Sequence, residues 1–330
     1  MKNSNVMVLG AGAWGSALAN VAAEGRARVP LWARDGAHVE ALAKDRENRK
    51  YLPDLPLAVA VAPTSDLSEL EQADIVLAVA PAQALRDLLQ KARPHLRRGA
   101  ALVVCAKGIE RATRKFLSEV VREEAPKVAP AVLSGPSFAA DVCRGLPTAV
   151  TIAATEAALA RKLAEALSTK TFRLYHSSDL RGVEIGGAAK NVLAIASGMA
   201  AGRKLGASAG AALVARGFAE LTRFGAALGA RPETLMGLSG LGDLVLTCGS
   251  AQSRNFALGQ ALGQGDAPSE ASHGKLAEGA FTAQALVEIA REHKIEMPIA
   301  EAVNAILAGK LSVDGAISAL LTRPLRAEAE

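Results

Sequence analysis

Three glycines near the start of the chain have the spacing of a dinucleotide-binding turn. Gly10, Gly12 and Gly15 follow the apolar residues 6–9 and precede a stretch that favours helix. In such a unit the first glycine makes the turn, the second lets the backbone approach a pyrophosphate, and the third lets helix and strand pack closely. The helix N-terminus then offers free N–H groups to phosphate oxygens. This spacing predicts a dinucleotide site; the alternative is a tight turn of an ordinary α/β protein.

The second expected strand, 29–32, ends beside a cation. A site selective for NAD has an acidic residue about 20 residues after the glycines, where it holds the ribose hydroxyls. Arg34 stands near that point instead, and its planar guanidinium suits a 2′-phosphate. Because Asp35 follows directly, the pattern favours NADPH and leaves NADH open. The alternative is that Arg34 is a solvated surface cation.

Two further segments follow expected strands at the edge where open α/β sheets bind ligands. Lys107 comes after strand 101–105, and a cation there suits a phosphate or the nicotinamide ribose. The loop 134–139 after the next strand combines two hydroxyls with turns fixed by glycine and proline, which favours anions. Ordinary turn chemistry is the alternative for both.

Lys190 is the one cation in a nearly apolar stretch that is expected to form a helix. Gly186 and Gly187 precede it by four and three residues, so they lie on its face and predict a close approach there. The glycine-rich run 237–243 could bring Asp243 beside this lysine. A buried, functional amine is therefore expected; the alternative is a lysine that snorkels to the surface.

A phosphate pocket is expected where Ser253 begins a new helix. A serine cap, the positive end of a helix dipole and the guanidinium of Arg254 together suit a phosphate. Glu278, by contrast, reads as an ordinary solvated acid from the residues alone.

The elements that must position these residues divide the chain in two. Apolar strands without alternation, separated by helical stretches, predict a mostly parallel sheet covered on both faces in residues 1–178. Strand signals end near residue 179, so residues 179–330 are expected to be all helical and to supply substrate binding and catalysis. The expected strands are 6–9, 29–32, 75–79, 101–105, 131–133, 149–152 and 172–175, with helices at 37–45, 83–91 and 113–124 and an exposed loop at 263–268.

Composition excludes several classes of protein. The net charge is only +5, aromatic residues make up 3%, and no long basic run occurs, so nucleic-acid binding is not expected and small phosphorylated ligands suit the field better. Three scattered cysteines argue against a disulfide framework, and the five histidines have no metal-ligand spacing. Lys190 and Asn191 interrupt the most apolar stretch, 185–201. We therefore expect no membrane insertion, no signal peptide and a cytoplasmic location.

In this order the motifs resemble those of the bacterial NAD(P)-dependent glycerol-3-phosphate dehydrogenases, over nearly the whole chain. The runs that carry the resemblance are 10–19, 134–139, 183–192, 237–248 and 253–255. The resemblance implies a Rossmann domain followed by an all-helical domain, usually in a homodimer. It implies reversible hydride transfer between NADPH or NADH and dihydroxyacetone phosphate, which gives sn-glycerol 3-phosphate for glycerophospholipid synthesis.

The resemblance also assigns roles to individual positions. Lys190 becomes the catalytic acid/base. The implied substrate contacts are Lys107, Gly135, Ser137, Lys190, Asp243, Ser253, Arg254 and Asn255. The implied cofactor contacts, together with the three glycines, are Ala13, Trp14, Arg34, Lys107, Ala139, Arg254, Leu276 and Glu278.

The chain departs from the family pattern at a few positions. Residues 79–83 replace the usual Val-Pro-Ser-His, Ala215 stands where threonine is common, and 206–210 lack a common Asp-Asn pair. None of these removes a residue that is assigned to chemistry. Two rival functions stay open at this point: a 3-hydroxy acid dehydrogenase of similar plan, and an NADPH-binding redox sensor without turnover.

Overall fold

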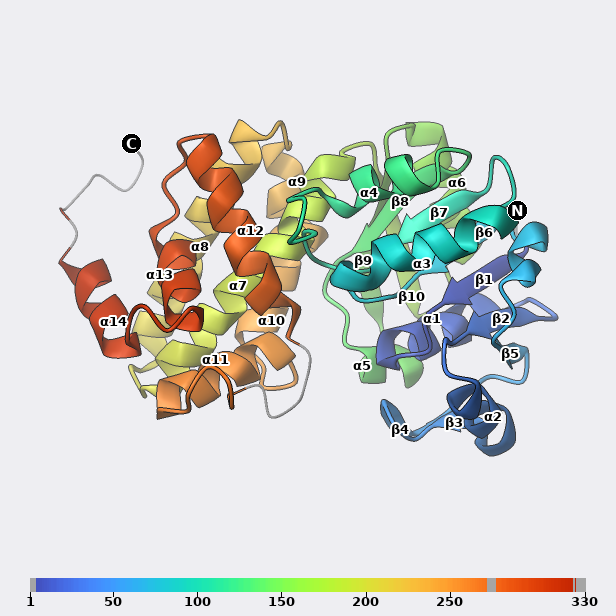
Figure 1. Cartoon of the computed structure of the whole chain (residues 1–330), viewed down its shortest axis with the longest axis horizontal. Helices are drawn as coiled ribbons and strands as arrows, with labels where there is room; N and C mark the ends of the chain where they lie inside the picture. The colour runs from blue at the N-terminus through green and yellow to red at the C-terminus, as the bar shows by residue number, and fades with distance from the viewer. Residues whose placement is uncertain (1–3, 272–276, 323, 325–330) are drawn as a thin grey trace.

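A computed structural model describes residues 4–271, 277–322 and 324 of the chain. The first half is built on one eight-stranded sheet with helices on its faces, and the second half is helical (Figure 1). The strands of the sheet, in spatial order, are β10 (Phe172–Ser177), β9 (Thr148–Ala154), β8 (Ala129–Ser134), β7 (Ala101–Val104), β6 (Ile75–Ala78), β1 (Val6–Leu9), β2 (Val29–Trp32) and β5 (Val61–Thr64).

The predicted α/β class and the mostly parallel sheet are confirmed, with one reversal. β8 and β9 pair antiparallel, whereas the other neighbours in this sheet pair parallel. A parallel partner needs a connection that crosses back over the sheet. The segment between β8 and β9 does not cross back; it stays at the end of the sheet where β8 stops. There, helix α5 (Ala139–Cys143) packs against α1 (Ala13–Ala23).

The region between residues 47 and 64 differs from the sequence prediction. It contains a small antiparallel pair, β3 (Glu47–Asn48) and β4 (Leu52–Pro56), and the edge strand β5. Prolines at positions 53, 56 and 63 hide the strand pattern, because proline weakens any strand assignment and is tolerated mainly at sheet edges.

The helices of the sheet half cover both faces. They are α1, α2 (Gly36–Asp45), α3 (Leu85–Ala92), α4 (Leu117–Glu124), α5 and α6 (Ala157–Leu167), with 3₁₀ turns η1 (Ser68–Gln72), η2 (Ala82–Ala84) and η3 (Arg93–His95). The helix predicted at 113–124 starts only at Leu117. Ile109 and Phe116 pair in an antiparallel bridge, so the residues before α4 form a closed loop instead.

The second half surrounds one buried helix, α7 (Leu180–Gly202), as Figure 1 shows. Around it lie α8 (Ala207–Ala227), α9 (Pro232–Met236), a π-helical turn η4 (Leu238–Gly242), α10 (Asp243–Cys248), α11 (Arg254–Gln264), α12 (Glu278–Glu292), α13 (Pro298–Leu307) and α14 (Val313–Leu321). The predicted loop at 263–268 begins later than expected, because α11 continues to Gln264 and ends at Gly265, whose φ is +112°.

Small residues allow α7 and α11 to approach each other closely. A Cβ added to Gly259 would lie 2.0 Å from the carbonyl oxygen of Ile195, so α11 could not pack here with any larger residue. The sequence predicts a buried, apolar α7, and nearly all of its residues are buried. Among the described residues, none of the helices combines the length and apolarity that a membrane span requires.

A buried carboxyl group fastens the two halves together. Glu184 on α7 accepts hydrogen bonds from the backbone N–H and the hydroxyl of Ser118 on α4, both at 2.8 Å. Nearby, Arg181 donates to Glu119 at 2.8 Å. Burial raises the pKa of Glu184 to about 7, although both bonds from Ser118 favour its ionised form.

This raised pKa predicts a pH-dependent stability. Below pH 4.5, the ordinary pKa of a glutamate, Glu184 is protonated in both the folded and the unfolded state and does not change the stability. As pH rises from there to about 7, the unfolded state loses this proton first, so the free energy of unfolding falls progressively. Glu184→Gln keeps the shape and can still bond Ser118. We therefore expect the variant to match the wild type near pH 4.5 and to gain up to about 3 kcal/mol of unfolding free energy above pH 7. Urea unfolding across this pH range checks it, and a constant difference between the two proteins would contradict it.

Candidate functional site

The carboxylate of Asp243 lies between two lysine ammonium groups. Its Oδ1 accepts from Lys190 Nζ at 2.8 Å, and its Oδ2 accepts from Lys107 Nζ at 2.7 Å. Asp243 begins α10, Lys190 lies on α7, and Lys107 follows β7 in the sheet half. The side chain of Asp243 is only 1% exposed. The glycine-rich run thus places Asp243 beside Lys190, as the sequence predicts, and the alternative of a surface lysine is wrong.

Burial and charge set the protonation of this triplet. Burial lowers the pKa of Lys190 to about 8, with the attraction of Asp243 opposing and the charge of Lys107 adding to the shift. Burial alone would raise the pKa of Asp243, but the two ammonium groups outweigh it and hold that pKa below its ordinary value. Near neutral pH, therefore, a carboxylate faces two cations, and the proton of Lys190 can leave at moderately alkaline pH.

Each ammonium group retains a donor for another molecule. Lys190 Nζ also donates to Thr247 Oγ1 at 2.7 Å, and Lys107 Nζ donates to the carbonyl oxygen of Gly135 at 2.8 Å. Within the described residues each lysine thus uses two of the three donors of its ammonium group. The third donor of each is available to a substrate oxygen.

Two glycines of α7 make room for this arrangement. A Cβ on Gly186 would lie 2.5 Å from the carbonyl oxygen of Ser239, and one on Gly187 would lie 2.7 Å from Ser134 Oγ. The close approach that the sequence predicts on the Lys190 face is therefore present. The buried hydroxyls of Ser134 and Ser239 have no hydrogen-bond partner among the described residues.

A chain of amide hydrogen bonds runs from Lys107 to the start of α12. Asn191 Nδ2 donates to the carbonyl oxygen of Lys107, and Asn255 Nδ2 donates to Asn191 Oδ1, both at 2.9 Å. The N–H of Gly279 then donates to Asn255 Oδ1 at 2.9 Å. Asn255 is thus largely engaged in the protein, and one amide hydrogen is left for a ligand.

Sequence reasoning did not assign Asn191 or Thr247 to the site. Thr247 stands four residues after Asp243, a spacing that places both on one face of α10. Asn191 is adjacent to Lys190 in the sequence. The sequence shows that both residues lie close to assigned site residues. Threonine and asparagine are also common in ordinary helix packing, so this closeness alone does not assign them to the site.

The glycine turn has the shape that a pyrophosphate requires. Gly10 has φ +118°, and a Cβ on Gly15 would lie 1.7 Å from the carbonyl oxygen of Gly10. A Cβ on Gly12 would meet nothing within 4 Å, so that backbone is open. No side chain caps α1, which begins with Ala13 and Trp14, so the first-turn N–H groups can bind phosphate oxygens. The residues present therefore fit a dinucleotide.

Other predicted cofactor contacts lie around this turn. Trp14 packs near Phe172 with ring centroids 6.3 Å apart, and Ala139 begins α5. Asp35 caps α2 by accepting from the N–H of Ala37 at 3.1 Å, which engages its carboxylate. Arg34 is exposed and makes no hydrogen bond or ion pair with the described residues. Leu276 lies outside the described residues.

The remaining predicted residues come from both halves: Ser253, Arg254 and Glu278 from the helical half, and Ser137 from the loop after β8 in the sheet half. Ser253 caps α11 as expected, because its Oγ accepts from the N–H of Phe256 at 3.3 Å, and Arg254 is exposed at the first position of that helix. Ser137 Oγ donates to the carbonyl oxygen of Gly135 at 3.1 Å. The expectation of a solvated Glu278 is wrong. Its carboxylate accepts from the N–H of Ala82 at 3.1 Å, and burial raises its pKa to about 7.

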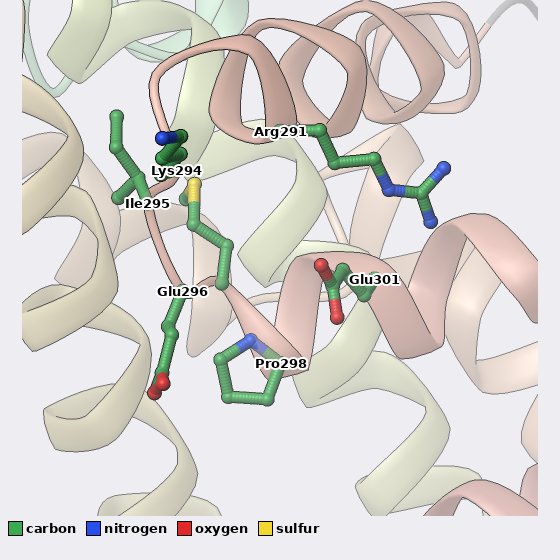
Figure 2. A pocket seen from close by; sticks show the side chains of 7 residues that line it. Arg291, Lys294, Ile295, Glu296, Pro298 and Glu301 are labelled. Atoms are coloured by element: carbon green, nitrogen blue, oxygen red, sulfur yellow. The ribbon is translucent and has the colours of Figure 1, made fainter.

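A separate cavity of about 380 Å³ opens on the helical half, between the end of α12 and the start of α13. Figure 2 shows Arg291, Lys294, Glu296 and Glu301 around it. Its two cations and two acids balance each other, and it lies at the other end of α12 from Glu278. The described residues contain no cluster of histidine, cysteine or acidic side chains that could hold a metal ion.

The comparisons with known proteins agree with this geometry. Residues 5–160 match the model for the N-terminus of NAD-dependent glycerol-3-phosphate dehydrogenase, and residues 179–318 match the model for its C-terminus. This chain belongs to that family. A glycerol-3-phosphate dehydrogenase [NAD(P)+] of Azorhizobium caulinodans is 62% identical over 98% of each chain, and one of Rhodopseudomonas palustris (strain BisA53) is 57% identical over 98% of this chain and 99% of that one.

A comparison with solved structures also finds a glycerol-3-phosphate dehydrogenase. The crystal structure of glycerol-3-phosphate dehydrogenase from Coxiella burnetii is 38% identical, covers 98% of this chain and 100% of its own, and has a TM-score of 0.93. A ketopantoate reductase from Ralstonia eutropha shares the fold alone, with 18% identity and a TM-score of 0.63. As a member of this family, the chain is an oxidoreductase that uses NAD(P)H.

The glycine turn generates a paired prediction. We expect Gly15→Ala to disrupt folding, because its Cβ would collide with the backbone of Gly10. We expect Gly12→Ala to keep the thermal stability within a few degrees and to weaken NADPH binding about tenfold or more, since the methyl group occupies the open space before α1. Thermal unfolding and a fluorescence titration with NADPH distinguish the two variants. Unchanged NADPH affinity in a folded Gly12→Ala protein would contradict the assignment of this turn.

Proposed function

We propose that this protein interconverts dihydroxyacetone phosphate and sn-glycerol 3-phosphate with NAD(P)H, and that Lys190 is its catalytic acid/base. The observation that carries this proposal is the buried Lys190–Asp243 pair, which lies beside the open ends of the parallel strands in a chain of this family. We also propose the boundary between the cofactor and substrate domains at residues 178 and 179.

The reaction develops negative charge on the oxygen of the central carbonyl group. A nicotinamide, when bound, supplies the hydride for the reduction. Lys190 donates a hydrogen bond to that oxygen and then its proton, which stabilises charge that exists only near the transition state. Asp243 and Thr247 hold the amine in place through their hydrogen bonds at 2.8 and 2.7 Å. In the reverse direction the neutral amine takes the proton from the alcohol.

The substrate phosphate needs cations and N–H donors away from the reacting carbon. Arg254 supplies an exposed guanidinium beside the N-terminus of α11, and Asn255 retains one amide hydrogen. The free donor of Lys107 adds a second charge from the sheet half. We propose Gly135, Ser137 and Ser253 as the remaining substrate contacts. The carbonyl oxygen of Gly135 accepts from both Lys107 and Ser137, and Ser253 caps the helix that carries Arg254 and Asn255.

The proposed cofactor contacts begin at the glycine turn between β1 and α1. We propose that Gly10, Gly12, Ala13, Trp14 and Gly15 hold the pyrophosphate through backbone N–H groups. Arg34 binds the adenosine ribose or its 2′-phosphate, and Lys107, Ala139, Arg254, Leu276 and Glu278 complete the set of contacts. The engaged carboxylate of Asp35 and the free guanidinium of Arg34 support a preference for NADPH.

Neither rival function accounts for the site as well. A redox sensor without turnover would not need a buried Lys190–Asp243 pair, which is costly to desolvate. A 3-hydroxy acid dehydrogenase would not need Arg254 beside a helix N-terminus. We further propose that the protein forms a homodimer, lies in the cytoplasm and supplies sn-glycerol 3-phosphate for glycerophospholipids. The family resemblance supports these three proposals.

Removal of the catalytic amine tests the mechanism. We expect Lys190→Ala to lower the rate of dihydroxyacetone phosphate reduction by about 10²–10⁴ while NADPH still binds. The wild-type rate should fall as pH rises through about 8, because reduction needs the protonated lysine. The loss of NADPH absorbance measures both effects, with the exposed Lys162→Ala as the matched control. Near-normal turnover of Lys190→Ala would falsify the mechanism.

Substitution of Arg34 tests cofactor choice. We expect Arg34→Ala to raise the KM for NADPH about tenfold or more and to leave the KM for NADH nearly unchanged, because only NADPH carries the 2′-phosphate. Steady-state kinetics with both cofactors provide the measurement, and the exposed Arg161→Ala serves as a control. An equal change for the two cofactors would refute this role.

A further inference from the structure

The loop 107–116 lies between β7 and α4 in the sheet half and contacts the helical half. It begins with Lys107, three residues after β7 ends at Val104, and closes through the bridge between Ile109 and Phe116. On the helical side, the carbonyl oxygen of Lys107 accepts from Asn191, and Arg114 forms an ion pair with Glu292 of α12. The position of this loop therefore sets where the ammonium group of Lys107 lies.

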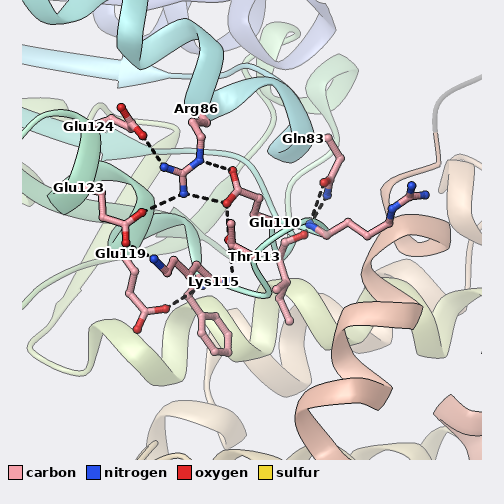
Figure 3. Close-up of polar contacts among 11 residues, drawn as sticks. Gln83, Arg86, Glu110, Thr113, Lys115, Glu119, Glu123 and Glu124 are labelled. Carbon is pink, nitrogen blue, oxygen red and sulfur yellow. Dashed lines mark hydrogen bonds and ion pairs between the residues drawn. The ribbon is translucent and has the colours of Figure 1, made fainter.

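Gln83 holds the backbone of this loop from the sheet side (Figure 3). Its Nε2 donates to the carbonyl oxygen of Ile109 at 2.8 Å, and its Oε1 accepts from the N–H of Arg111 at 2.9 Å. One side-chain amide thus satisfies an acceptor and a donor of the loop. Gln83 lies in η2, within the segment that departs from the family pattern.

Arg86, three residues after Gln83 in the chain, holds the side chain of Glu110, which lies between Ile109 and Arg111. Its Nε and Nη2 donate to the two carboxylate oxygens of Glu110 at 2.9 and 2.8 Å. Arg86 Nη2 also donates to Glu123 of α4 at 2.9 Å, and Thr113 donates to Glu110. Figure 3 shows these bonds converging on the Glu110 side chain and the Arg86 guanidinium. Such a bidentate contact fixes the orientation of the Glu110 carboxylate as well as its distance from Arg86.

Only one residue, Gly108, separates Lys107 from the part of the loop that Gln83 holds, and it has no room for a side chain. A Cβ on Gly108 would lie 2.9 Å from the Cβ of Ala82 and 3.1 Å from Glu278 Oε2. With Gly108 packed against Ala82 and Glu278, we expect a shift of Ile109 to reach Lys107.

We propose that Gln83 is a positioning residue for the reaction: by holding the backbone of Ile109 and Arg111, it keeps Lys107 Nζ within hydrogen-bond reach of Asp243. The effect of Gln83 passes through Lys107, which contacts the substrate in the function proposed above. The inference rests on that proposed function.

The position of Lys107 has a measurable electrostatic consequence. The groups that face Lys190 are Asp243, Thr247 and Cys248 on α10, and Lys107 from the loop. If Lys107 withdraws, Asp243 attracts Lys190 alone and a like charge is removed. Both changes raise the pKa of Lys190, so the decline of the reduction rate at alkaline pH must move to higher pH.

Gln83→Met tests the proposal, because methionine has a similar length and can form neither bond. In the full-length protein, we expect the KM for dihydroxyacetone phosphate to rise about tenfold, the size expected from two lost hydrogen bonds. We also expect the alkaline limb of the pH profile to move to higher pH. Gln284→Met is the matched control, since the one bond of this exposed glutamine's side chain to the described residues is to Glu288 on its own helix, at 2.9 Å.

A Lys107→Met background separates positioning from a merely structural role. If Gln83 acts through Lys107, Gln83→Met adds no further change of KM or pH profile in that background. Equal effects in both backgrounds, or an unchanged KM and pH profile in the single variant, overturn the proposal. Absence of turnover in the wild type, which is assayed first, overturns the proposed function and this inference together. A normal wild type with an unaffected Gln83→Met protein overturns only the positioning role.

Discussion

The arrangement of the molecule depends on the pairing of one buried carboxylate. Asp243 is withdrawn almost completely from water, which costs several kcal/mol for an unpaired ion. Its partners come from both halves of the chain: Lys190 from the helical core and Lys107 from the loop after β7. Separation of the halves would leave this charge with one partner. The contact therefore fixes the relative position of the halves and also prepares the amine that we assign to proton transfer.

Neutral contacts extend this connection toward the cofactor side. The amides of Asn191 and Asn255 link the backbone of Lys107 to Gly279 at the start of α12. Glu278, the residue before, reaches back to the backbone of Ala82 in the sheet half. The regions that we propose for substrate and cofactor thus share one hydrogen-bonded framework, so neither can shift far without the other.

Features that depend on residues close together in the sequence can be predicted from it, and these include much of the fold and part of the site. The glycine turn, the buried helix around Lys190 and the Ser253 cap each depend on residues close together in the sequence, and the structure contains all three elements. The pairing of Lys107 with Asp243 spans 136 residues, and no local rule predicts it. The sequence alone does not indicate that Glu278 is buried, because its contact with Ala82 comes from a segment 196 residues away. The reversed β9 was missed because strand direction depends on the path of the connection, which composition does not encode.

The burial of α7 constrains how the enzyme can change. Nearly every residue of this helix is enclosed by its neighbours, and it carries Lys190 near its middle. Core helices open with free energies near that of global unfolding, so we expect the amide hydrogens around the lysine to be among the slowest to exchange. The amine is consequently a fixed reference point. Motion during turnover falls to the loops and ligands that come to it, and new substrate preferences can evolve only in those surroundings.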